Sequence, residues 1–337
     1  MVAASKRVDA AGNETVLAAA VDVHKEFARR RAFPGGREIV HAVNGVSLEI
    51  ETGMTLGLVG ESGCGKSTLG RLFLGLMPPT SGTVFFEDRD LSRLERAGMK
   101  DVRRGIQAIF QDPLGSLNPF MSVADILDEP LRIHNVGSRS ANGARIRQLL
   151  ELVGLPESSL RRRPSEFSGG QQQRIAIARS LVLNPRLLVA DEALSALDVS
   201  IQAQIVNLFL DVQRELGLSY LFISHNLKIV RHIAQHVAVM YLGKVVELGP
   251  AEAIYRHPRH PYTLALLSAV PVPDPPVERR RRRIALQGDP PSPTNIPTGC
   301  PFRTRCWKVQ PRCETEVPAL ENGGPQPDHR VACHFPE

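Results

Sequence analysis

The fold is decided by one stretch of the sequence, GESGCGKST at residues 60–68. This stretch satisfies the pattern G-x-x-x-x-G-K-[ST], in which glycine backbone N–H groups wrap phosphates, the lysine reaches the β- and γ-phosphates and the hydroxyl binds Mg²⁺. The apolar run 55–59 predicts a strand before the loop, and residues 69–76 predict a helix after it, which Pro78 and Pro79 end. A strand, a glycine-rich loop and a helix in this order predict an α/β domain that binds a nucleotide.

The sequence on either side of this unit predicts further layers. Residues 15–23 and 39–50 mix β-branched and apolar residues and predict a small antiparallel sheet. The continuous apolar runs 187–190 and 220–223 predict parallel strands covered on both faces, with a helix at 201–216 between them. The region between the first core strands and these runs is mostly helical, with helices predicted at 123–133, 144–152 and 171–183.

The composition changes sharply at Pro271, after which proline, arginine and glycine indicate a linker into a small cysteine-bearing tail. The sequence contains no internal repeat and no second phosphate loop. We therefore expect six segments: an N-terminal tail (1–14), the first part of a nucleotide-binding core with an antiparallel β layer (15–111), a helical insert (112–180), the second part of the core (181–270), a Pro/Arg linker (271–298) and a cysteine-rich tail (299–337).

The chain as a whole has the composition of a globular protein. It has 337 residues, of which 42% are hydrophobic. No stretch reaches the roughly 18 to 20 apolar residues of a membrane span, and residues 1–15 lack the apolar run of a signal peptide, so we expect a cytoplasmic location. The net charge of +6 would suit nucleic acid or an anionic membrane, but part of it lies in two local runs, 161–163 and 279–283.

A second informative stretch, 186–192, is an apolar strand that ends in two adjacent carboxylates, Asp191 and Glu192. Strand alternation points the two side chains in different directions. We expect Asp191 to hold the Mg²⁺ shell and Glu192 to face the γ-phosphate, where it orients or deprotonates the attacking water. The alternative is that the pair begins a turn and caps the next helix.

A third stretch, Phe-Ser-Gly-Gly-Gln at 167–171, resembles the signature sequence of ABC ATPases. Other motifs of that family occur at suitable distances along the sequence from this one. Gln111 is similar to the Q-loop glutamine, residues 195–198 resemble the D-loop, and His225 resembles the switch histidine. The resemblance covers about residues 15–250. It implies a P-loop NTPase core of the ABC ATPase type, with an antiparallel β subdomain, a helical insert subdomain and a small C-terminal cysteine-rich tail.

The resemblance also implies that two subunits share each nucleotide. The phosphate loop of one subunit and the signature of the other close on the same ATP, and Ser67, Gln111 and Asp191 bind Mg²⁺. The catalytic residues are then Glu192, His225 and Gln111, where His225 contacts the γ-phosphate and Gln111 reports to the membrane partner. The residues expected to bind ATP in this chain are Gly60, Ser62, Gly63, Cys64, Gly65, Lys66, Ser67, Thr68 and Phe27. The residues expected to serve the partner's ATP or the dimer contact are Ser168, Gly169, Gly170, Gln171, Ser195 and Asp198.

Several positions leave alternatives open. Phe27 is expected to stack on adenine, with Phe33 as a second candidate and a core phenylalanine as the alternative interpretation. Ala193 follows Glu192 where the family commonly has proline, and Asn226 follows His225 where aspartate is usual. Neither difference removes a catalytic group, so we expect an active hydrolase.

The stretch QDPLGSLNP at 111–119 resembles the ATPases of oligopeptide and dipeptide importers. The helix that opens at 260–263 and the tail from 299 agree with this resemblance, and the signature form resembles the second ATPase subunit of such importers. It implies a paralogous ATPase in a heterodimer, two transmembrane permeases, an extracytoplasmic solute-binding protein and a position at the cytoplasmic face of the membrane. Nucleic acid is not an expected partner. The alternative is a soluble ABC-type ATPase that acts on nucleic acid or ribosomes.

The tail holds four cysteines with the spacing C-x₅-C-x₆-C-x₁₉-C, namely Cys300, Cys306, Cys313 and Cys333. In a reducing compartment such a cluster suggests a metal before disulfides. We expect a [4Fe–4S] cluster, with Zn²⁺ or free or oxidised thiols as alternatives. The fifth cysteine, Cys64, is interpreted as a tolerated residue of the phosphate loop, open to alkylating agents. The arginine run 279–283 is a solvated linker or a contact with anionic lipid.

Overall fold

A computed structural model describes residues 16–30, 37–271, 274–280, 283–323 and 328–337. Phe33, the tail 1–14 and part of the arginine run 279–283 lie outside these residues. The described strands form two sheets, one of four strands and one of eight. The larger sheet follows the order β11-β12-β10-β9-β3-β8-β7-β6, and the smaller one the order β2-β1-β4-β5.

The parallel part of the larger sheet contains the predicted strands 55–59, 187–190 and 220–223. The strands β6, β7, β8, β3 and β9 run parallel to one another, and β10 returns antiparallel to β9. Burial on both faces favours continuous apolar runs in such strands, which is why the sequence predicted three of them. The bounds are β3 (Thr55–Val59), β6 (Ile106–Ile109), β7 (Leu187–Asp191), β8 (Ser219–Ile223), β9 (His236–Tyr241) and β10 (Lys244–Pro250).

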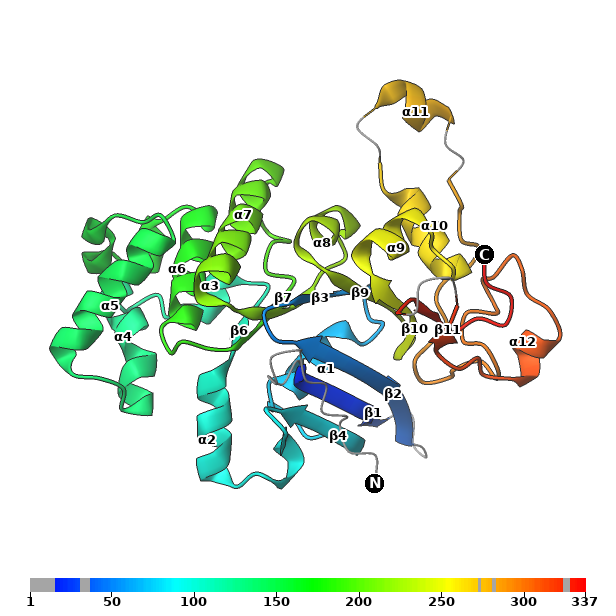
Figure 1. Ribbon diagram of the computed structural model, residues 1–337, viewed down its shortest axis with the longest axis horizontal. Coiled ribbons are helices and arrows are strands. Elements are labelled where there is room, and N and C mark those ends of the chain that lie inside the picture. Colours follow the sequence, from blue (N-terminus) through cyan, green and yellow to red (C-terminus); the bar gives the residue numbers. More distant parts are fainter. Residues whose placement is uncertain (1–15, 31–36, 272–273, 281–282, 324–327) are drawn as a thin grey trace.

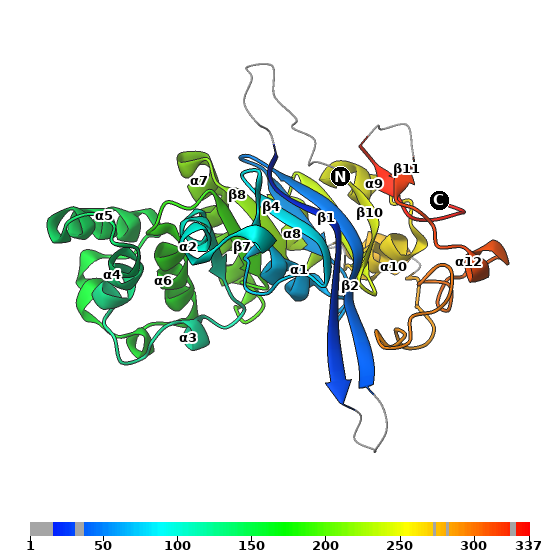
Figure 2. The same cartoon turned by 90° about the horizontal axis from the view of Figure 1, so that it is seen from below.

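The smaller sheet is the predicted antiparallel layer, but its two long strands extend beyond the predicted ranges. The strands are β1 (Val16–Arg30), β2 (Arg37–Glu51), β4 (Ser81–Phe86) and β5 (Arg89–Asp90). The helix α1 (Lys66–Phe73) is packed between the two sheets, because its buried Leu69, Leu72 and Phe73 share one apolar cluster with residues of both. Figures 1 and 2 show this helix in the middle of the molecule.

Between β6 and β7 the described chain contains only helices and short helical turns. The α-helices are α3 (Pro113–Ser116), α4 (Val123–His134), α5 (Arg139–Leu152) and α6 (Gly169–Leu181). The start of α4 is fixed by a capping box, in which Ser122 and Asp125 each satisfy the other's backbone N–H. Three of these helices confirm the predictions at 123–133, 144–152 and 171–183. They lie together at one end of the molecule (Figure 1).

Helices after β7 cover the opposite face of the larger sheet from α1. Phe209 of α7 packs edge-on against Tyr220 and Phe222 of β8, with ring centroids 5.6 and 5.8 Å apart. These helices are α7 (Val199–Leu216), which confirms the helix predicted at 201–216, α8 (Leu227–Ile233), α9 (Ala251–Arg256) and α10 (Pro261–Ala269). The helix α2 (Arg96–Gly105) was not predicted. No described helix combines the length and the apolar character that crossing a membrane requires.

The chain after α10 returns to the edge of the larger sheet (Figure 1). The strand β12 pairs with β10, and β11 pairs with β12. The backbone N–H of His41 on β2 donates to the carbonyl oxygen of Pro293 at 3.0 Å. The chain after α10, linker and tail together, is therefore joined to both sheets. Its elements are α11 (Pro275–Arg280), α12 (Arg312–Thr315), β11 (Glu321–Asn322) and β12 (Arg330–Val331).

Candidate active site

At two positions, the glycine-rich loop between β3 and α1 has no room for any residue larger than glycine. A Cβ on Gly60 would lie 2.2 Å from the carbonyl oxygen of Met240, and a Cβ on Gly65 would lie 2.0 Å from that of Ala42. Both glycines have positive φ, 152° and 107°. The loop leads directly into α1, whose first residue is Lys66. The first N–H groups of a helix have no partner within it, so this helix start suits an anion.

Lys66 is buried and already held by the loop. Its Nζ donates to the carbonyl oxygens of Gly60 and Glu61, at 2.8 Å each. Cys64, whose Sγ lies 3.8 Å from the same Nζ, is also buried. Burial raises the pKa of the Cys64 thiol, and the charge of Lys66 opposes this shift. Cys64 is therefore a poor target for alkylation, in contrast to the expectation from sequence.

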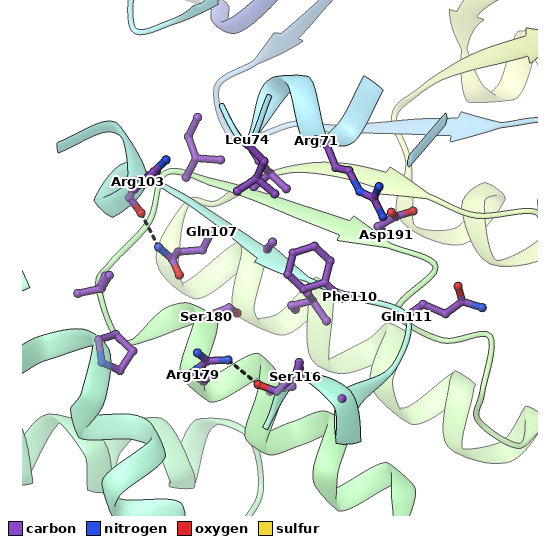
Figure 3. Close-up of a pocket in the computed structure, with 18 of the residues that line it drawn as sticks. Arg71, Leu74, Arg103, Gln107, Phe110, Gln111, Ser116, Arg179, Ser180 and Asp191 are labelled. Atoms are coloured by element: carbon purple, nitrogen blue, oxygen red, sulfur yellow. Dashed lines mark hydrogen bonds between the residues drawn. The ribbon is translucent and has the colours of Figure 1, made fainter. Parts of the chain in front are cut away.

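Two of the three predicted magnesium ligands, Ser67 and Asp191, meet at the end of β7, and Gln111 is exposed. Ser67 Oγ donates to Asp191 Oδ1 at 2.9 Å. Burial raises the pKa of Asp191, and the Ser67 hydroxyl, Arg71 and Lys66 oppose this shift. A hydroxyl beside a carboxylate is a donor set that suits Mg²⁺, because the ion prefers oxygen ligands. Arg71, one helical turn after Ser67 on α1, points toward Asp191 (Figure 3). It was not predicted, although its spacing from Ser67 places it on the same helix face.

Glu192 and His225 form a pair beside this group. His225 Nδ1 lies 3.5 Å from Glu192 Oε1, and the two side chains are 59% and 19% exposed. Glu192 has φ 49°, a left-handed conformation that is costly for a residue with a side chain. Its backbone N–H still donates to the carbonyl oxygen of Ile223 on β8, at 3.0 Å. The turn after β7 therefore directs the carboxylate of Glu192 away from the path of the strand.

The site arises from the topology of the sheet. Gly60, Gln111, Asp191 and His225 each lie at or just after the carboxyl end of a parallel strand, β3, β6, β7 and β8 in turn. Neighbouring parallel strands end at the same edge, where α/β sheets bind their ligands. Gln111, Ser67 and Asp191 accordingly line one cavity of about 760 Å³ (Figure 3), a volume within the usual range for a ligand pocket.

The signature residues lie at the start of α6, among the helices at the end of the molecule, whereas α1 lies near the centre of the sheet (Figure 1). Ser168 is the N-cap, and its hydroxyl and the side chain of Gln171 form a capping box. Gly169 is exposed, while a Cβ on Gly170 would lie 2.7 Å from Ile201 Cγ2. The helix start therefore presents N–H groups to an incoming anion.

The residues predicted for the D-loop and the adenine contact are exposed. Ser195 Oγ donates to the carbonyl oxygen of Glu192 at 2.9 Å, and Asp198 precedes α7. Phe27, which is 40% exposed, pairs across the smaller sheet with Val40. The ammonium of Lys25 lies 5.3 Å from its ring centroid. Phe27 is thus no core phenylalanine, and the Lys25 ammonium lies over its ring.

The four tail cysteines line one small cavity of about 10 Å³. Among the described residues, no group of three or more His, Cys, Asp and Glu side chains is placed as a metal site. The backbone N–H groups of Phe302, Lys308 and Phe335 nevertheless favour the thiolate forms of Cys300, Cys306 and Cys333, each two residues earlier in the chain. Burial raises the pKa of Cys300 to about 11 and also raises the pKa of Cys306 and Cys333, so these thiols are protonated without a cation beside them.

Comparisons with known proteins agree with this geometry. The ABC transporter family profile matches residues 43–195, and the profile "Oligopeptide/dipeptide transporter, C-terminal region" matches residues 246–313. The chain is 49% identical over 328 residues to the oligopeptide transport ATP-binding protein AppF of Bacillus subtilis, covering 97% of this chain and 99% of that protein. It is 51% identical to OppF of Salmonella typhimurium, covering 87% of each chain.

Solved structures give the same result. The dimeric bacterial ABC transporter cassette MJ0796 matches with a TM-score of 0.61 and 27% identity, covering 70% of this chain and 99% of that one. CbiO1 of Clostridium perfringens matches with a TM-score of 0.63 and 26% identity, covering 72% and 92%. The α/β core with its antiparallel layer agrees with the fold of such a cassette. The chain therefore belongs to the ABC transporter family, as an ATPase subunit of the oligopeptide/dipeptide importer type.

Proposed function

We propose that this subunit hydrolyses ATP with the residues at the carboxyl edge of the parallel strands. Lys66 and the N–H groups of the loop bind the phosphates, and Ser67, Asp191 and Gln111 hold Mg²⁺. The ion, when bound, neutralises charge on the phosphate oxygens. Glu192 orients and deprotonates the attacking water, and His225 positions Glu192 and the γ-phosphate. The observation that carries this assignment is the convergence of the Ser67–Asp191 and His225–Glu192 pairs at one edge of the sheet.

We propose further that each ATP is completed by a second, paralogous ATPase. The exposed start of α6 at Ser168 and Gly169 supports this, because no described contact joins it to the loop 60–68 of the same chain. Helix N–H groups left open to solvent suit the phosphates of a partner's nucleotide. Ser195 and Asp198 lie exposed beside the site, where they meet the partner. The dimeric cassette MJ0796, to which the chain is similar, is consistent with such a pair.

The cavity in Figure 3 is the proposed docking site for a permease. It opens between the end of α1, β6 and the helices α4 and α6, and Gln111 lies on its wall. Exposed apolar side chains of Leu76, Phe110 and Ile133 line it. Such an apolar lining fits one face of a short amphipathic helix from a cytoplasmic loop of the permease. Docking there would place this subunit at the cytoplasmic face of the membrane, next to the residue that senses the nucleotide.

The test of the proposed function is reconstitution of the full chain with its paralogous ATPase, two permeases and the solute-binding protein in vesicles. ATP-dependent uptake of a labelled oligopeptide is expected, with ATPase activity that the loaded binding protein stimulates. Ile133→Asp should abolish uptake and leave nucleotide binding by the isolated chain intact, because it alters only the cavity lining. Leu216→Asp, at an exposed apolar position at the end of α7, is the matched control. Recovery of ribosomes or nucleic acid instead of permeases would support the alternative function.

We infer that the cysteine tail binds a [4Fe–4S] cluster. The four cysteines face one cavity, and the three backbone N–H donors would stabilise thiolates bound to a metal. Protein purified without oxygen is expected to contain about four irons per chain and visible absorption, both lost in Cys306→Ser and kept in Cys64→Ser. One zinc per chain, or neither metal, would reject the cluster.

A further inference from the structure

We propose that Arg305, in the cysteine tail, is a positioning residue for ATP binding, because it holds Glu61 of the phosphate loop. Arg305 Nη1 lies 2.8 Å from Glu61 Oε2, and Nη2 lies 3.2 Å from Oε1. The contact is a two-bond guanidinium–carboxylate pair between residues 244 positions apart. The two side chains are only 7% and 28% exposed. A pair with this geometry and burial is stronger than a surface ion pair.

The backbone of Glu61 is also held, by a residue of α10 that packs against the tail. Its N–H donates to the Tyr262 hydroxyl of α10 at 2.8 Å. Tyr262 is fully buried and packs against Phe302 of the tail, with ring centroids 5.4 Å apart. Figure 2 shows the tail running beside β10 and α10. The residue after Gly60 is therefore fixed by one contact from the tail and by one from a helix that packs against the tail.

Glu61 matters for ATP because of its charge and its carbonyl oxygen. The loop binds phosphate anions, and a free carboxylate inside it would repel them. Arg305 neutralises that carboxylate. The carbonyl oxygen of Glu61 also accepts from Lys66 Nζ, so a shift of Glu61 moves the lysine that reaches the phosphates. Arg305 thus acts on the nucleotide through Glu61 and needs no contact with it.

The tail has a second, independent attachment that leaves it in place when Arg305 is changed. The fully buried Glu247 of β10 lies 2.7 Å from His329 Nε2, and it also accepts the backbone N–H groups of Arg259 and His260 at 2.7 and 3.0 Å. The β12 strand pairs with β10 beside this group. We therefore expect Arg305→Gln to fold with its tail docked.

The experiment measures Mg²⁺-dependent binding of a fluorescent ATP analogue to the full chain. Arg305→Gln should raise the Kd roughly tenfold, because the unpaired Glu61 carboxylate disfavours the phosphates. The kcat of the reconstituted complex at saturating ATP should stay within about twofold of the wild type, because no reacting group changes. Arg303→Gln is the matched control, since the hydrogen bonds that the structure describes for Arg303 go to Thr298 and do not reach the phosphate loop.

A second substitution, at Glu61, distinguishes a positioning role of Arg305 from a merely structural one. Glu61→Gln combined with Arg305→Gln removes both charges, and it should restore the Kd to within about threefold of the wild type. Loss of tail structure would not be rescued in this way. Trp307, the sole tryptophan, reports on the tail directly, and its emission should respond to MgATP in the wild type and not in Arg305→Gln.

The proposal is overturned if Arg305→Gln binds the analogue within about twofold of the wild type, or if the double variant is no better than the single one. Should Arg305→Gln fail to fold, Arg305→Lys, which keeps the charge with one fewer bond, must give an intermediate Kd. The inference rests on the assignment of the loop to phosphate binding, which Lys66→Ala tests separately. Normal binding by Lys66→Ala would reject that assignment, whereas lost binding there with normal binding by Arg305→Gln would reject only the role of Arg305.

Discussion

Ser67 Oγ donates to Asp191 Oδ1 at 2.9 Å, and this hydrogen bond joins the first turn of α1 to the last residue of β7. The two residues are 124 positions apart, and each belongs to a different motif. Their contact brings a hydroxyl and a carboxylate to the loop that binds the phosphates. Mg²⁺ prefers oxygen ligands of these two kinds, so we propose that both residues bind the ion.

Asp191→Asn should weaken magnesium binding, because the amide keeps the size of the side chain and its bond to Ser67 but not the negative charge. The Mg²⁺ concentration for half-maximal ATPase activity is expected to rise roughly 10- to 100-fold. The measurement is a Mg²⁺ titration of the reconstituted complex at fixed ATP. Asp211→Asn, on the exposed face of α7, is the control and should leave the titration unchanged. Equal titrations for the two variants would contradict the role of Asp191.

Glu192→Gln should stop hydrolysis and leave ATP binding intact. The amide cannot accept a proton from water, so the rate should fall at least about 100-fold, the usual contribution of a general base. Unhydrolysed ATP should then keep the two ATPases together, which gel filtration with retained radiolabelled ATP would detect. Glu215→Gln, exposed near the end of α7, serves as the control. Turnover close to that of the wild type would reject Glu192 as the base.

Gly169→Asp should act on the partner's nucleotide and not on this chain's own. The start of α6 tolerates aspartate, because a negative charge there favours the helix and a Cβ meets nothing closer than Leu197 Cδ2 at 3.6 Å. The new carboxylate would face the partner's phosphates, where like charges cost several kcal/mol.

The measurement is photolabelling of the assembled complex with azido-ATP. Labelling of the partner ATPase should fall roughly tenfold or more while this chain keeps its label. Ser165→Asp, exposed just before the signature, is the control. Lost labelling of this chain, with the partner unaffected, would show that the signature serves the nucleotide of its own subunit.

Much of the site could be predicted from sequence because its residues follow neighbouring parallel strands. Gly60, Asp191 and His225 each come at or just after the end of an apolar run, and such runs end at one edge of a sheet. The ends of local apolar runs thus indicated which distant residues lie together at the edge of the sheet. The backbone strain at Glu192 and the direction of Arg71 depend on the assembled turn and helix, and no local pattern indicates them.

Other elements escaped prediction because tertiary contacts form them. The end of β1 has charged and polar residues, yet Phe27 and Ala28 continue the strand by pairing with Val40 and Ile39. The helix α2 contains two glycines and few apolar residues, and Val102 is its one fully buried residue, so its sequence has too little apolar character to indicate a packed helix. The contact of Arg305 with Glu61 spans most of the chain, and neither residue has a neighbour that indicates it.

The buried His260 predicts how the junction of core and tail responds to acid. Burial lowers its pKa to about 4, and the charge of Glu247 opposes this shift. In the unfolded chain histidine titrates near 6.5, so between about 6.5 and 4 the unfolded state binds a proton that the folded state does not. Stability from the neutral His260 is therefore fully present above pH 6.5 and is lost as the pH falls toward 4.

The expected loss is about 2 kcal/mol of unfolding free energy between pH 6.5 and 5, at about 1.4 kcal/mol per pH unit. His260→Asn tests this, because its amide oxygen can still accept the N–H of Tyr262, as His260 Nδ1 does at 3.0 Å, and it does not titrate. Urea unfolding at both pH values should show a smaller pH dependence for His260→Asn than for the wild type or for the exposed control His257→Asn. Parallel losses in all three proteins would mean that the acid sensitivity arises elsewhere, for instance at the neighbouring pair of Glu247 and His329.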